Sequence, residues 1–224
     1  MRIALIHALT ESVAPVHAAF ARHWPAATCF DLLDNSLSAD LADAGMLTPA
    51  LHARFLTLGH YAAEQQGKGG KTTAILFTCS AFGPAIEAVK QAVALPVLKP
   101  NESAFASALA AGSRIALLVT FPPSLESLRV ELQQMAAGAG RQVTIEARIV
   151  DGALAALKAG DATSHDRLIA AAAEALPPVD AVILGQFSMA RAAAIMPPRS
   201  DRQIITTPDA AVLALRQMLT GTGA

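Results

Sequence analysis

The chain has 224 residues, 53% of them hydrophobic, and its 17 Lys and Arg residues against 18 Asp and Glu give a formal net charge of −1. This near-neutral charge, without a basic stripe, argues against a nucleic-acid surface, and no apolar run reaches the roughly 20 residues that span a bilayer. The amino terminus runs into a strand pattern without a signal-peptide cleavage site, so we expect no membrane association and a cytoplasmic protein whose partner is a small molecule.

Eight short apolar segments read as β-strands and alternate with Ala-rich helical stretches. In chain order they are residues 2–7, 28–33, 73–78, 95–99, 114–120, 143–150, 180–185 and 202–207. Strands that are apolar throughout and separated by helices are typical of parallel sheets covered on both faces. The sequence therefore predicts an α/β protein.

The two halves of the chain repeat each other. "RIALIH" at 2–7 matches "RIALLV" at 114–119 almost letter for letter, and "AILFTCSAF" at 74–82 matches "AVILGQFSM" at 181–189 in pattern. Such a repeat predicts two pseudo-symmetric lobes, each a four-stranded parallel sheet flanked by helices, with the active site in the cleft between them.

The lobe boundaries follow from the same symmetry. The helix at 101–111 follows the fourth strand, and the last helix follows the eighth strand in the same way. We expect each of these two helices to cross to the opposite lobe. The first lobe is thus predicted to comprise residues 1–98 plus 208–224, and the second lobe residues 99–207.

Candidate site residues are those that follow the strands, because ligands of parallel α/β sheets bind beyond the carboxyl ends of the strands. They are His7, Ser36, Thr78, Cys79, Ser80, Thr120, Gln186 and Ser188. Several hydroxyls together with helix-start amides suit a carboxylate ligand, although each hydroxyl alone is more often a helix cap. The segment that holds Ser36 also reads as a helix-entry turn with Ser38 as its cap.

Cys79 is the candidate acid/base. It ends the third predicted strand and precedes a helix expected to begin near Pro84, and a helix amino terminus lowers the pKa of a nearby thiol. The alternative is a small buried residue, the usual state of a free cysteine. Cys29 lies inside an apolar strand, where burial explains it, and two cysteines without a CxxC spacing indicate neither a disulfide framework nor a zinc site.

Two further strand-end residues complete the candidate set. Gln186 is the repeat partner of Cys79, and an amide cannot exchange protons at neutral pH. His7 is either a second titrating group or ligand donor, or a hydrogen-bonded structural histidine.

No cofactor and no metal are expected. The first strand is not followed by the glycines of a dinucleotide site, and Gln65 stands where the first glycine of a phosphate loop would be in "QQGKGGKTTAILF". Because these glycines precede a strand, we interpret the segment as a flexible helix-to-strand loop. The remaining histidines show no HxxxH spacing and no flanking carboxylate.

The duplicated halves, with "FTCSAFG" in the first and "ILGQFSM" in the second, resemble the aspartate/glutamate racemase superfamily, which includes hydantoin racemase, maleate isomerase and arylmalonate decarboxylase. The resemblance covers essentially the whole chain. It implies a cofactor-independent enzyme that transfers a proton at the carbon next to a carboxylate, with Cys79 as acid/base and with Ser80 and Thr120 as carboxylate-binding groups. A homodimer is what the family commonly forms.

The departure from the family pattern is Gln186, which stands where the second cysteine is usual. Two-base racemisation needs one proton-transfer group on each face of the stereocentre. Three functions therefore stay possible from the sequence. The first is a racemase-like or isomerase-like reaction of a small amino acid or dicarboxylate, and the second is a single-cysteine decarboxylation of a malonate-like acid. The third is a catalytically degenerate protein that only binds a carboxylate. Whether Cys79 acts as a nucleophile, and whether His7 or Glu11 replaces the missing base, also stays open.

Overall fold

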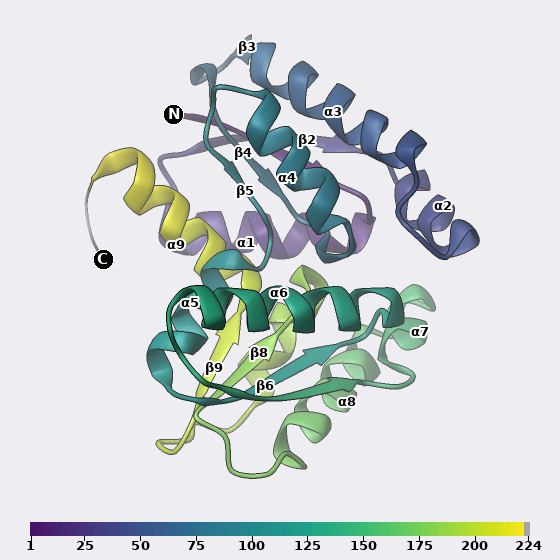
Figure 1. Cartoon of the computed structure of the whole chain (residues 1–224), viewed down its shortest axis with the longest axis vertical. Helices are drawn as coiled ribbons and strands as arrows, with labels where there is room; N and C mark the ends of the chain where they lie inside the picture. The colour runs from purple at the N-terminus through teal and green to yellow at the C-terminus, as the bar shows by residue number, and fades with distance from the viewer. Residues whose placement is uncertain (222–224) are drawn as a thin grey trace. The chain divides into compact units, whose positions relative to one another are not determined.

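The computed structural model describes residues 1–221, and the chain divides into two compact units. Unit 1 consists of Met1–Pro100 together with the chain from Ala211 onward, and unit 2 is Asn101–Ala210. Each unit contains a mainly parallel sheet with helices packed against it (Figure 1).

Unit 1 contains a five-stranded sheet. Its strands are β1 (Arg2–His7), β2 (Thr28–Leu33), β3 (Gln66–Gly67), β4 (Gly70–Phe77) and β5 (Val97–Leu98). The order is β2-β1-β4-β3, with β5 also paired to β4, and every pair is parallel except β3 with β4. The helical segments are η1 (Thr10–Ser12), α1 (Val13–His23), α2 (Ser36–Ala44), α3 (Pro49–Glu64), η2 (Ser80–Phe82), α4 (Gly83–Ala92) and most of α9 (Thr207–Thr220).

Unit 2 contains a four-stranded parallel sheet. Its strands are β6 (Arg114–Val119), β7 (Thr144–Ile149), β8 (Ala181–Leu184) and β9 (Gln203–Thr206), in the order β7-β6-β8-β9. The helical segments are α5 (Glu102–Ala111), η3 (Pro122–Ser124), α6 (Leu125–Gly138), α7 (Ala153–Lys158), α8 (Ala162–Glu174) and η4 (Phe187–Ile195).

The predicted fold class is confirmed: the protein is α/β, with two parallel-sheet lobes flanked by helices. A strand overlaps each of the eight predicted segments, with the bounds shifted by up to three residues. The helix α5, which follows β5, belongs to unit 2, whereas α9 follows β9 and contributes most of its length to unit 1. There Arg216 Nη1 donates a hydrogen bond of 2.9 Å to the His23 carbonyl.

The glycine-rich segment between α3 and β4 forms a tight antiparallel hairpin where the sequence predicted a loop without a strand. Gly67 pairs with Gly70, and Gln66 pairs with Lys71. The turn needs positive φ angles of 88° at Gly69 and 94° at Gly70, which glycine adopts without steric cost. The hairpin adds β3, a strand that the apolar pattern did not predict.

The two faces of the unit 2 sheet bury separate apolar clusters. Leu117 and Ile183 pack on one face with Phe105 of α5, whereas Leu118 and Val182 pack on the other face. This alternation places neighbouring strand residues in different cores, both closed to water, which explains why the strands are apolar at successive positions.

In unit 1, three stacked aromatic rings join α3 to the end of β4. The Phe55 ring stacks on Phe82 with centroids 4.7 Å apart and on Phe77 at 5.4 Å. All three side chains are almost completely buried. Phe82 ends η2, the short turn that follows Cys79, so this cluster anchors the segment beyond the strand end.

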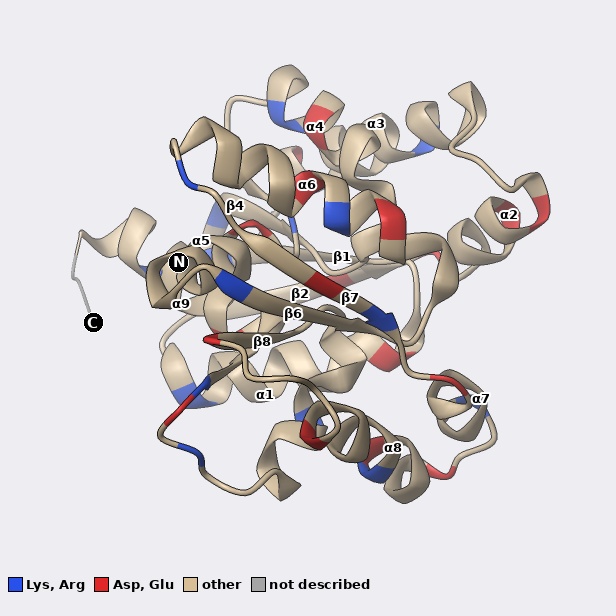
Figure 2. Cartoon of the chain, turned by 60° about the horizontal axis from the view of Figure 1, so that its bottom comes forward, with Lys and Arg blue, Asp and Glu red and all other residues tan. Residues whose placement is uncertain are grey.

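Charged residues of both signs are interspersed over the helices and strands (Figure 2). Many of them touch, as in β7, where Arg148 Nε lies 2.7 Å from Glu146 Oε1. Within residues 1–221, no helix combines the length and the apolar character needed to cross a membrane.

Candidate functional site

The carboxyl ends of β1 and β4 bring four predicted site residues to one edge of the unit 1 sheet. The two strands are parallel neighbours whose register pairs Ile6 with Phe77, and the Thr78 N–H donates a hydrogen bond of 3.0 Å to the Ile6 carbonyl. His7 therefore ends its strand beside Thr78, and Cys79 and Ser80 follow directly. All four side chains are buried.

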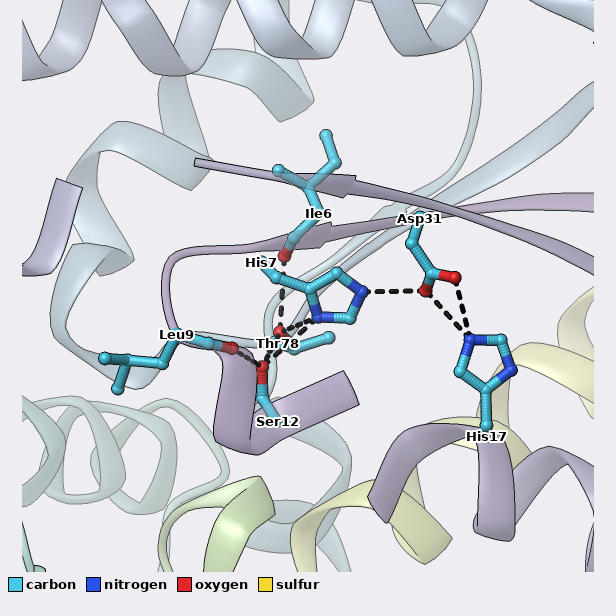
Figure 3. A network of polar contacts seen from close by, with 7 residues as sticks. All are labelled: Ile6, His7, Leu9, Ser12, His17, Asp31 and Thr78. Atoms are coloured by element: carbon cyan, nitrogen blue, oxygen red, sulfur yellow. Dashed lines mark hydrogen bonds and ion pairs between the residues drawn. The ribbon is translucent and has the colours of Figure 1, made fainter. Parts of the chain in front are cut away.

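The His7 ring is hydrogen-bonded through both nitrogens (Figure 3). Nδ1 lies 2.8 Å from Thr78 Oγ1 and 3.2 Å from Ser12 Oγ, and Nε2 lies 2.9 Å from Asp31 Oδ1. The two hydroxyls are 2.9 Å apart. One polar network, buried except at Asp31, thus joins the end of β1, the turn η1, the strand β2 and the end of β4.

The outer end of this network is His17 on α1. Its Nε2 lies 2.9 and 3.0 Å from the two carboxylate oxygens of Asp31, and its side chain is half-exposed. Asp31 therefore lies between the buried imidazole of His7 and the half-exposed imidazole of His17. It belongs to the network because β2 pairs with β1 in a register that sets Leu5 opposite Asp31, on the same face as His7.

The partners of His7 fix its tautomer. A carboxylate only accepts hydrogen bonds, so Nε2 carries the proton that is donated to Asp31, and Nδ1 of the neutral ring accepts from Thr78. Burial lowers the pKa of His7 below its usual value of 6.5, because the loss of hydration outweighs the attraction to Asp31. His7 is neutral at pH 7.

A pH dependence of stability follows from this lowered pKa. Above pH 6.5 the ring is neutral in both the folded and the unfolded state, but below it the unfolded chain binds the proton first. We expect the free energy of unfolding to fall more steeply between pH 7 and pH 5 in the wild type than in His7→Asn. The difference in slope is at most about 1.4 kcal/mol per pH unit. Urea unfolding at several pH values measures this difference, and parallel curves for the two proteins would contradict it.

Cys79 is a thiol in this structure, because burial raises its pKa to about 11. Interactions with the Ala81 backbone and the Ser38 side chain lower the pKa, but by less than burial raises it. Burial therefore outweighs the lowering of the pKa that the sequence led us to expect at the start of a helix. The turn η2 separates Cys79 from α4, which begins at Gly83, and a helix dipole acts mainly within the first turn.

The helix α2 places Ser38, and not Ser36, beside Cys79. The Ser36 hydroxyl donates to Asp34 Oδ1 at 2.6 Å and accepts from Arg54 Nη2 at 2.5 Å, within a cluster in which Arg54 also forms an ion pair with Asp34. Ser38 is buried, and its hydroxyl donates to the Ala8 carbonyl at 3.0 Å. Its side chain also interacts with Cys79. Because α2 begins at Ser36, Ser38 lies inside the helix and does not cap it.

In unit 2, the Gln186 side chain is bound by groups that follow β6. Its Oε1 accepts hydrogen bonds from the Thr120 N–H at 2.6 Å, the Thr120 hydroxyl at 2.8 Å and the Phe121 N–H at 3.2 Å. Backbone N–H groups only donate, so the accepting atom is the amide oxygen, and Nε2 is the end that can donate to a ligand. Ser188 lies two residues further on in η4 and is half-buried.

In each unit, the predicted candidates thus follow the carboxyl ends of parallel strands, with Ser36 in a separate cluster with Asp34 and Arg54. Unit 1 holds His7, Ser36, Thr78, Cys79 and Ser80, and unit 2 holds Thr120, Gln186 and Ser188. Sequence reasoning missed Ser12, Asp31 and Ser38. Only Asp31 carried a visible signal, as a single charged residue within the otherwise apolar strand "TCFDLL".

The donor chemistry of the site is that of hydrogen bonding and proton transfer. Among residues 1–221, no group of three or more His, Cys, Asp or Glu side chains is placed to hold a metal ion. A surface pocket of about 460 Å³ lies beyond the amino ends of β8 and β9, where Asp180 and Arg202 contribute to its lining. Asp180 is bound by Arg114, and Arg202 by Glu174, so the pocket offers paired charges and no acid/base.

A family model matches most of the chain, and several solved structures share its fold. The family model for Asp/Glu/hydantoin racemases matches residues 15–215, whereas no curated protein matches the chain in sequence. Allantoin racemase from Klebsiella pneumoniae superimposes with a TM-score of 0.72 at 18% identity, over 100% of this chain and 89% of that chain.

Two further solved structures share the fold. A glutamate racemase from Bacillus anthracis has a TM-score of 0.67 at 12% identity, over 98% of this chain and 81% of that chain. A glycine-to-cysteine mutant of arylmalonate decarboxylase, associated with sulfate, has a TM-score of 0.65 at 18% identity, over 100% and 95% of the two chains. At these identities the similarity is one of fold.

Proposed function

Because the chain belongs to the Asp/Glu/hydantoin racemase family, we propose that it is a cofactor-independent, racemase-like or isomerase-like enzyme that transfers a proton at the carbon next to a carboxylate. The substrate is a small amino acid or dicarboxylate. The observation that carries the proposal is the buried thiol of Cys79 directly beyond β4, while the matching position in unit 2 holds the amide of Gln186.

Cys79 is the group that holds the proton. The resting thiol first loses its proton to water, and the Sγ thiolate then takes the proton from the substrate carbon, while the electron pair left behind is delocalised into the adjacent carboxylate. The thiol then returns a proton to that carbon. The Ala81 N–H and the Ser38 hydroxyl stabilise the thiolate stage, because both hydrogen bonds lower the pKa of Cys79.

Gln186 binds and orients the substrate in this proposal. Its oxygen is held by Thr120 and Phe121, so the Nε2 end donates hydrogen bonds to a carboxylate oxygen. Because an amide neither takes nor gives a proton at neutral pH, Gln186 does not act as a second base. We therefore expect exchange of the carbon-bound proton to be faster than inversion of the centre.

A decarboxylase of a malonate-like acid is the second candidate, and the resting state of Cys79 favours it. A pKa of about 11 makes Cys79 a proton donor at neutral pH. When the carbon–carbon bond to the departing carboxylate breaks, the electron pair stays on the carbon. That carbon takes the Sγ proton, and water then reprotonates the thiolate. One donor suffices for this reaction.

Incubation of the protein with a panel of amino acids, small dicarboxylates and substituted malonates in heavy water tests these proposals. Proton NMR follows loss of the signal next to the carboxylate, polarimetry follows inversion, and carbon dioxide release follows decarboxylation. Exchange faster than inversion supports the first proposal, and carbon dioxide release supports the second. Ligands that bind but show none of the three changes would identify a degenerate carboxylate-binding protein.

A further inference from the structure

The segment that carries Cys79 is held by few backbone contacts. The strand β4 ends at Phe77, so Cys79 lies two residues beyond the strand. The Thr78 N–H continues the ladder with one hydrogen bond, to the Ile6 carbonyl. The Thr78 side chain supplies further polar contacts, through its hydroxyl to His7 Nδ1 at 2.8 Å and to Ser12 Oγ at 2.9 Å.

His7 is itself held in one orientation. Its Nε2 donates to Asp31, whose other contact, with His17, keeps the carboxylate in place (Figure 3). The ring is 0% exposed, and both of its nitrogens are used by other side chains of unit 1. The His7 ring therefore holds its neighbouring side chains by hydrogen bonds, and neither of its nitrogens is left to bind a substrate.

From these contacts we propose that His7 is a positioning residue: its Nδ1 fixes the Thr78 hydroxyl and thereby the placement of Cys79 beyond β4. The proposal rests on the proposed role of Cys79 as the proton-transfer group. It assigns His7 to the support of the thiol in place of the substrate contact that the sequence predicted. Asp31 takes part because its carboxylate keeps the Nε2 proton in place and leaves Nδ1 as the acceptor.

The first test compares two buried threonines of one strand region. Thr78→Val removes the hydroxyl that His7 holds, and Thr72→Val removes an equally buried hydroxyl at the start of β4, where it bonds to the Gln65 carbonyl. Both are made in Cys29→Ser protein, so that iodoacetamide reports on Cys79 alone. We expect Thr78→Val to speed alkylation of Cys79 about tenfold through local loosening, and Thr72→Val to leave it within about twofold.

The second test uses the two amides that mimic the two nitrogens of His7. Asn places an amide where Nδ1 lies and can still accept from Thr78, whereas Gln places it where Nε2 lies and retains only the bond to Asp31. We expect His7→Gln to lower the rate of carbon-bound proton exchange about 10- to 100-fold with little change in KM. His7→Asn is expected to stay within about threefold of the wild type. The double variant His7→Gln/Thr78→Val should be no slower than Thr78→Val alone.

Each of the two comparisons, of the threonine variants and of the His7 variants, either supports or overturns the proposal. Equal alkylation rates in Thr78→Val and Thr72→Val would overturn it, as would equal losses of rate in His7→Asn and His7→Gln, which would indicate direct contact with the substrate. The alkylation readout needs no substrate. If the wild type shows no exchange with any acid, the proposed function fails, while the alkylation rates still decide whether the Thr78 hydroxyl that His7 holds fixes the placement of Cys79.

Discussion

Cys79→Ala is expected to slow proton exchange, or carbon dioxide release, by about 10²- to 10⁴-fold, the usual contribution of a positioned acid/base. Cys79 is the one of the chain's two cysteines that follows a strand end. Its side chain is small and buried, so alanine leaves a modest cavity and the fold is retained. The rates of both proteins are measured on the same substrate by proton NMR in heavy water.

Cys29→Ser is the matched control for this experiment. Cys29 lies within β2, where burial, with a smaller contribution from Asp31, raises its pKa to about 12. It therefore contributes no thiolate at neutral pH, and we expect its replacement to change the rate less than about twofold. Activity that survives in Cys79→Ala but not in Glu11→Gln would assign the proton transfer to Glu11.

Phe82→Ala is expected to lower the free energy of unfolding by about 3 to 5 kcal/mol, the range for a large buried ring replaced by alanine. Phe82 is 0% exposed, and its ring stacks on Phe55 of α3. The change removes apolar contacts and leaves a cavity that the surrounding β4 and α3 side chains fill only in part. Urea unfolding at pH 7 measures the loss.

Two variants bracket this prediction. Phe82→Leu keeps most of the apolar volume and should cost less than half as much as alanine. Tyr61→Ala, on the same helix as Phe55, removes a side chain that is 52% exposed and should change stability by at most about 0.5 kcal/mol. If Phe82→Ala costs no more than Tyr61→Ala, the aromatic cluster does not anchor the segment after Cys79.

The inner strands β1, β4, β6 and β8 were predictable from the sequence because they are mostly buried on both faces of their sheets. Leu117 and Leu118 lie in separate apolar clusters, so an uninterrupted apolar run marks the strand. The repeat between the halves identified the residues beyond these strands. The pairing of Gln66 with Lys71 escaped prediction, since a two-residue strand leaves no periodic pattern and its turn depends on glycine φ angles.

The site was less predictable, because its chemistry depends on contacts between distant segments. The pKa of Cys79 is raised by burial, which outweighs the lowering by the hydrogen bonds with Ala81 and Ser38, and the sequence alone does not reveal this burial. Asp31 reaches His7 only through the register of β1 with β2. Neither burial nor register can be read from local sequence.

The amide of Gln186 also has a stereochemical consequence. A planar carbanion next to a carboxylate has two enantiotopic faces, and two opposed thiols would protonate either one. Among the described residues, the thiol at a strand end stands in unit 1, and the matching residue in unit 2 is Gln186, whose oxygen is already bound by Thr120 and Phe121. In the proposed reaction the proton is therefore delivered to one face, and the chirality of the product follows from this difference between the two halves of the chain.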